Sequence, residues 1–214
     1  MALTPAERIL HVEGNDDRHV IIHLLEENKH LIGERGHMVD IKVAGNDRGV
    51  LSALGVAVKA AAGKAVGFIL DADQSIGARW GQICAELKPI GLNMPEVPPA
   101  DGFIGEANSL RARVGVWLMP DNQRDPGKLE DLLRTLVPTG DTLYAIAERS
   151  TGEAVKEGAQ FSGNDRIKAT LHCWLAWQEC PGLPYGTAIK AKFFKADSPA
   201  ARQFMDWFKR LYQL

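Results

Sequence analysis

The sequence predicts an α/β protein, with a mostly parallel sheet flanked by helices and a C-terminal helical extension. Short apolar runs alternate three times with segments of helical periodicity before Pro89. Strands that alternate with helices in this way form parallel sheets through right-handed crossovers. Beyond residue 125, amphipathic helical patterns replace the strands. We therefore expect an α/β core in residues 1–125 and a helical part in residues 126–214, packed together as one compact unit.

The first strand–helix unit brings two acids close together. Residues 8–12, RILHV, predict a strand that ends at Glu13 and Gly14, where glycine allows the chain to turn. Residues 18–27 carry apolar side chains at helical spacing. This order places Glu13 at the tip of the strand and Asp17 beside it in the first helical turn.

The next two units repeat this order. Residues 38–44 and 65–73 predict strands, and residues 49–62 and 76–87 predict helices. The run 65–73, AVGFILDAD, is apolar almost to its end, as expected for a strand buried on both faces. Residues 111–119 predict a further strand after a proline-rich loop.

The predicted strand of residues 65–73 ends in two aspartates one residue apart, Asp71 and Asp73. Because side chains alternate along a strand, both are expected on the same side, where they can share a hard cation; the alternative is that they cap the next helix. The carboxyl ends of parallel strands meet at one edge, so Glu13 is expected beside them. Acids gathered there repel one another unless a cation lies among them, which predicts a site for Mg²⁺ or Mn²⁺.

The helical part is predicted from apolar stripes in residues 129–136, 144–157, 165–179 and 199–212. Glu130, in the first turn of the first of these helices, is either an added metal ligand or an acid that interacts with the helix dipole. The last helix either closes the fold or provides a homodimer contact.

At the acids a resemblance becomes visible. HVEGNDD followed by FILDAD resembles the Toprim domain, in which a glutamate closes the first strand and an aspartate pair closes a later one. Glu13, Asp71 and Asp73 match these positions, and the spacing to Asp17 is most similar to the OLD-type and RNA-maturation nucleases. With the later phrases MPDN…G.LEDLL and RIKATLHCWLAWQ, nearly the whole chain resembles an uncharacterised bacterial family of OLD-like Toprim proteins.

The resemblance implies a Toprim-like, Rossmann-like fold and a set of site residues. It implies catalytic roles for Glu13 and Lys168, the lysine stabilising negative charge that develops on the phosphate; the alternative for Lys168 is an exposed lysine on a helix surface. The implied metal ligands for one or two ions are Glu13, Asp17, Asp71 and Asp73, with Glu130 as an added candidate.

The expected function is metal-dependent phosphodiester hydrolysis of DNA or RNA. Two alternatives remain open: a catalytically silent, regulatory module that binds metal or nucleotide, and a primase-like nucleotidyl transferase. The sequence contains no GxxxxGK[ST] phosphate loop, so an OLD-type ATPase would be a separate partner chain.

Charge and composition limit the partners. A formal net charge of -2 gives no general attraction for nucleic acid, so a local patch or bound cations would have to hold it. Three widely spaced cysteines and the lack of a long apolar run predict a cytoplasmic protein without disulfides or membrane spans. Basic residues in the last quarter are expected to flank the acidic edge: Lys190, Lys192, Lys195, Arg202, Lys209 and Arg210.

Overall fold

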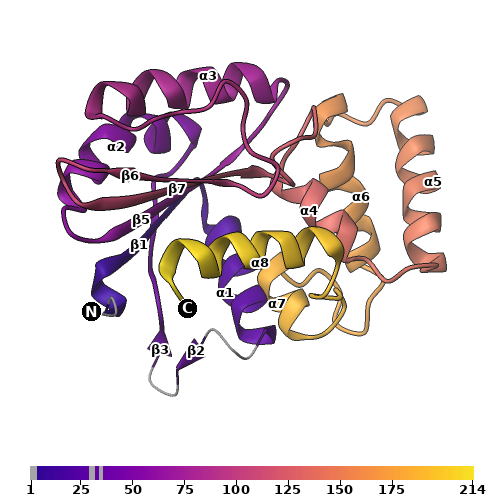
Figure 1. Ribbon diagram of the computed structural model, residues 1–214. Helices are drawn as coiled ribbons and strands as arrows, with labels where there is room; N and C mark the ends of the chain where they lie inside the picture. The colour runs from indigo at the N-terminus through magenta and orange to yellow at the C-terminus, as the bar shows by residue number, and fades with distance from the viewer. Residues whose placement is uncertain (1–3, 29–31, 34–35) are drawn as a thin grey trace.

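The computed structural model describes residues 4–28, 32–33 and 36–214, and in these residues five strands form one sheet (Figure 1). The strands lie in the order β4 (Asp40–Val43), β1 (Arg8–Val12), β5 (Ala65–Asp71), β7 (Ala112–Met119) and β6 (Phe103–Ala107). The pairs within the first four strands are parallel, and β6 pairs with β7 in the antiparallel direction. The mostly parallel α/β fold is therefore confirmed.

Helices cover both faces of the sheet, because residues of the central strands face alternately to the two sides. On one face α2 (Asp47–Ala60) and α3 (Ile76–Leu87) enclose a core with Phe68. On the other face α1 (Asn15–Glu27) contributes to a core that contains Trp117. The carboxyl ends of the four parallel strands consequently share one edge.

The remaining helices form the C-terminal part of the molecule (Figure 1). These are α4 (Leu129–Leu136), α5 (Thr142–Lys156), α6 (Arg166–Leu175), α7 (Tyr185–Lys190) and α8 (Pro199–Tyr212). The structure also has three single 3₁₀ turns (Pro5–Glu7, Lys88–Ile90 and Gly163–Asp165) and a short antiparallel pair, β2 (Ile32–Gly33) with β3 (Gly36–His37), in its described residues.

The last helix, α8, lies directly on the sheet and closes the fold. The Tyr212 hydroxyl donates a hydrogen bond to the Ile9 carbonyl at 2.7 Å, and Arg113 Nε donates to the Leu211 carbonyl at 3.1 Å. A Cβ added to Gly67 on β5 would come within 2.7 Å of the Tyr212 hydroxyl oxygen. A glycine in the strand therefore permits the close approach of the helix.

None of the described helices is both long enough and apolar enough to span a bilayer.

Candidate functional site

A pocket of about 420 Å³ opens at the carboxyl ends of the strands. Among the described residues, six carboxylates and two lysines line it, a formal charge of −4 when all are ionised: Glu13, Asp16, Asp17, Asp71, Glu130 and Asp165, with Lys128 and Lys168. The chain thus brings together acids from four separate segments. Four of the five predicted ligands and the predicted lysine are in this pocket.

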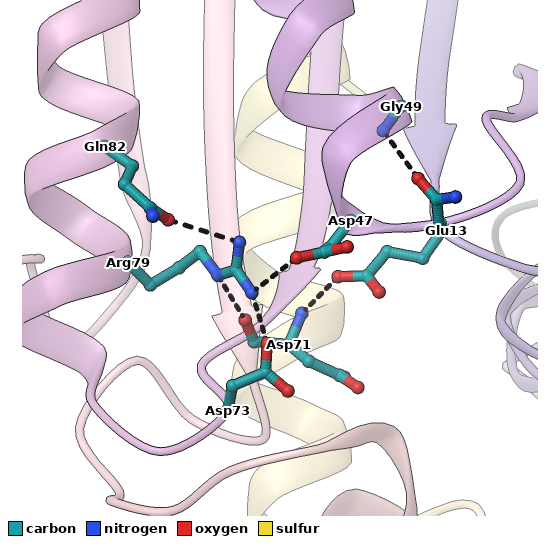
Figure 2. Close-up of polar contacts among 8 residues, drawn as sticks. Glu13, Asp47, Gly49, Asp71, Asp73, Arg79 and Gln82 are labelled. Carbon is teal, nitrogen blue, oxygen red and sulfur yellow. Dashed lines mark hydrogen bonds and ion pairs between the residues drawn. The ribbon is translucent and has the colours of Figure 1, made fainter.

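Glu13 and Asp71 come from adjacent parallel strands and are held by backbone groups. Glu13 Oε1 accepts a hydrogen bond from the Asp71 N–H at 2.9 Å (Figure 2). Asp71 Oδ1 in turn accepts from the Leu129 N–H, also at 2.9 Å. The second oxygen of each carboxylate accepts no hydrogen bond from any described residue. Each side chain is therefore oriented through one of its two carboxylate oxygens.

Asp17 and Glu130 enter the pocket from the first turns of α1 and α4. Asp17 Oδ2 accepts a hydrogen bond from the Gly14 N–H at 2.9 Å, so this acid also stabilises the start of its helix. Glu130 is only 7% exposed, and its Oε1 lies 3.1 Å from Lys168 Nζ. Glu130 is thus a buried partner of Lys168 as well as an acid at a helix start.

The expectation that Asp73 continues the alternation of the strand is wrong. The strand β5 ends at Asp71, and Asp73 has a φ of 53°, where the backbone turns and pairs with Gly127. The Asp73 carboxylate forms an ion pair with Arg79 and does not line the pocket. Figure 2 shows the Asp73 carboxylate at the Arg79 guanidinium group, whereas the Asp71 side chain extends away from that group. Asp73 as a metal ligand remains a prediction.

Arg79 organises the chain next to the pocket, a role that the sequence analysis missed. Its Nε donates to the Asp71 carbonyl at 3.1 Å, and its Nη2 donates both to Asp47 at 3.1 Å and to Asp73 (Figure 2). The side chain is almost fully buried. The sequence feature that could have indicated this role is an arginine in the first turn of the helix that follows Asp71 and Asp73, because its long side chain can reach back to them.

Three acids of the pocket resist ionisation: Glu13, Asp17 and Asp71. Burial raises the pKa of Glu13 to about 7, and the nearby Asp17 carboxylate adds to the effect. Burial likewise raises the pKa of Asp17 to about 6, with a contribution from Glu130. The pKa of Asp71 lies well above its ordinary value because of burial and the charge of Glu13. Without a cation, the pocket therefore holds its full negative charge poorly at neutral pH.

The family model described as "Protein of unknown function (DUF3226)" matches residues 7–213, nearly the whole chain. The chain belongs to this family. The match spans every acid and lysine of the pocket, as well as Asp73 and Arg79. The searches of curated proteins and of solved structures found no match.

The donor set of the pocket fits a hard divalent cation by its chemistry, since carboxylate oxygens are the ligands that Mg²⁺ and Mn²⁺ prefer. As the side chains stand, however, no group of three or more His, Cys, Asp or Glu residues in the described chain is arranged to hold an ion. Two of the candidate ligands are also paired within the protein: Glu130 with Lys168, and Asp73 with Arg79. Ion binding therefore requires carboxylates to turn toward one another.

Two lysines flank the acids, and one of them, Lys128, was not anticipated. Lys128 Nζ lies 3.3 Å from Asp165 Oδ1, and the residue directly precedes α4. Partial burial opposes the charge of Lys168, but the neighbouring Glu130 carboxylate outweighs it and raises the pKa of the lysine. The basic residues of the last quarter do not line the pocket. The positive charge beside the acids comes instead from the starts of α4 and α6.

Proposed function

We propose that the chain is a metal-dependent phosphodiesterase of nuclease type, acting on DNA or RNA through a Toprim-like carboxylate site. One observation carries the proposal: carboxylates from four separate chain segments line a single pocket together with Lys168. Acids that merely cap their own helices have no reason to converge in this way. The Toprim resemblance of the strand tips supports the same reaction class.

Glu13, Asp17, Asp71 and Glu130 would hold one or two Mg²⁺ or Mn²⁺ ions. The ions would supply an activated water molecule and stabilise the charge on the leaving oxygen. The negative charge of the acids that line the pocket repels a phosphodiester until cations neutralise it. Asp73 would join the ligands only after leaving Arg79.

The chain's own groups position the substrate. Lys168, held at the pocket by Glu130, stabilises negative charge on the phosphate oxygens. Glu13, fixed through one oxygen by the Asp71 N–H, can accept a hydrogen bond from the attacking water with the other. We propose these two residues as the catalytic side chains.

A second candidate function uses the same pocket. The ion pairs that occupy Glu130 and Asp73 favour a module that binds metal or nucleotide without turnover, because each pair removes a ligand. A primase-like nucleotidyl transferase would need the same acids and is distinguished by its product.

The test combines binding and cleavage measurements on the same samples. Mn²⁺ is titrated calorimetrically into the parent chain, Asp71→Asn and the exposed control Glu86→Gln, and each sample is assayed on plasmid DNA and RNA. We expect the parent and the control to bind Mn²⁺ and cleave. Asp71→Asn should cleave at least roughly 100-fold more slowly than the parent, since even residues that only support metal ligands contribute about 10- to 100-fold to metal affinity or activity.

The other outcomes separate the candidates. Binding of Mn²⁺ or nucleotide without cleavage favours the silent module, and incorporation of nucleoside triphosphates into a polymer favours the transferase. A parent chain that does not bind Mn²⁺ contradicts the proposed metal site.

A further inference from the structure

A groove of about 910 Å³ runs along α5 and α6 in the C-terminal part of the molecule. Figure 1 shows these two helices side by side, at the opposite end of the molecule from α2. Four basic and two acidic residues of the described chain line the groove: Arg134, Arg149, Lys156 and Arg166, with Glu148 and Glu153. Its formal charge of +2 contrasts with the −2 of the whole chain.

Most of the positive charge in the groove is unpaired. Arg134 lies 4.0 Å from Glu148, a distance at the limit of an ion pair. Arg149, Lys156 and Arg166 are exposed and form no ion pair with any residue that the structure describes. Cations that have no internal partner keep their capacity for an anionic ligand.

A glycine within a helix lines the groove. Gly152 lies within α5, where glycine disfavours the helical state. A Cβ at this position would approach Arg166 Nη2 to 3.1 Å. Tyr144 adds a half-buried aromatic wall, with its ring 6.1 Å from that of Trp174. The groove thus combines free cations with an aromatic surface.

The groove and the carboxylate pocket are built from the same helices. In α4, Glu130 lines the pocket, and Arg134, one turn later, lines the groove. In α6, Lys168 lines the pocket, while Arg166 and Ile167 line the groove. The two sites are therefore neighbours in the fold.

We propose that this groove binds the sugar-phosphate backbone of a nucleic-acid strand that continues into the carboxylate pocket. The link to the pocket rests on the proposed function, whereas the binding itself does not. Cations spread along two helices suit a chain of phosphates, and an aromatic wall suits the bases, which an acidic peptide lacks. The groove supplies the local positive charge that the overall composition of the chain lacks.

The experiment measures binding in EDTA, so that its result is independent of metal and cleavage. Fluorescence anisotropy follows labelled 20-mers of single-stranded DNA and RNA over a series of salt concentrations. The test variant Arg149→Ala/Lys156→Ala is compared with Lys59→Ala/Lys88→Ala, which removes the same charge from exposed positions on α2 and directly after α3. We expect the groove variant to bind roughly 10-fold more weakly, with a salt slope smaller by about 1.4, since each phosphate contact on a single strand contributes about 0.7.

A second pair of variants leaves every cation in place. Gly152→Glu puts an acid into the groove, and Gly55→Glu puts one on α2, where a Cβ meets nothing within 4 Å. Only Gly152→Glu should weaken binding, and thermal unfolding checks that all variants fold. Equal affinity of the parent, groove variants and controls for the oligonucleotides overturns the proposal. Polyglutamate, an acidic peptide, serves as a second ligand. The proposal is also overturned if the groove variants lose affinity for polyglutamate but keep that of the parent for the oligonucleotides. Intact groove binding without Mn²⁺-dependent cleavage leaves this inference standing and contradicts only the proposed function.

Discussion

At the scale of single residues, Glu13 shows how a buried acid of the pocket weakens the metal-free fold. Its pKa rises from the ordinary value of 4.5 to about 7, chiefly because of burial. Between these pH values the folded protein binds a proton that the unfolded chain has released. The folded state is therefore favoured at low pH, and this contribution is lost as the pH rises through about 7.

This predicts that Glu13→Gln stabilises the metal-free protein at high pH. Glutamine keeps an oxygen to accept the hydrogen bond from the Asp71 N–H but carries no charge. In EDTA at pH 8, the free energy of unfolding should increase by about 3 kcal/mol, since the pKa rises from 4.5 to about 7 and one pKa unit corresponds to about 1.4 kcal/mol. The difference should vanish near pH 4, where the carboxyl is protonated in both states. Urea unfolding at both pH values, with Glu86→Gln as the exposed control, measures it; a less stable Glu13→Gln at pH 8 would contradict the prediction.

The sequence predicted most of the pocket but not its fixed arrangement. Glu13, Asp17 and Asp71 follow from strand tips and helix starts, which are local features. Asp73 could not be placed, because its direction depends on a positive φ and on Arg79, a residue of the following helix. The place of Lys128 in the pocket was not predicted, because Lys128 contacts Asp165, which is distant from it in the sequence.

At the scale of elements, the observed strands and helices agree closely with those predicted from hydrophobic periodicity. The helices of residues 76–87 and 199–212 have their predicted bounds, because Ser75 and Ser198 cap their first turns. By contrast, none of the predicted helices covers the residues of α7. It has only six residues, too few for a periodic pattern to emerge.

The contact of α8 with the sheet leads to a second prediction, for Gly67→Ala. A Cβ on Gly67 would come within 2.9 Å or less of Tyr212, Leu211 and Leu10, all of which are fully buried. Overpacking here should lower the free energy of unfolding by about 1–3 kcal/mol. The control, Gly81→Ala on the exposed side of α3, has no atom within 4 Å and should raise stability by roughly 0.5–1 kcal/mol. Equal effects of the two substitutions in urea unfolding would show that α8 does not pack tightly on β5.

At the scale of the whole molecule, one core joins the predicted α/β part to the helical part. Trp117 of β7 lies 5.5 Å from Phe204 and 5.6 Å from Trp207 of α8, measured between ring centroids. The Trp207 Nε1–H also donates a hydrogen bond to the Phe103 carbonyl at 3.1 Å. Residues that follow position 125 thus bury a large part of one face of the sheet, beside α1.

We therefore predict that the whole chain unfolds as a single cooperative unit. Separating the two parts would expose Trp117 and the apolar face around it to water. This exposure costs about 25 cal/mol of free energy for each Å² of apolar surface. Differential scanning calorimetry should give one transition, with equal calorimetric and van't Hoff enthalpies. A chain of residues 1–125 should lack a cooperative transition, because α1 is then the only helix left on that face of the sheet. Two separate transitions in the whole chain, or cooperative folding of the shortened one, would mean that the α/β part is stable without α8.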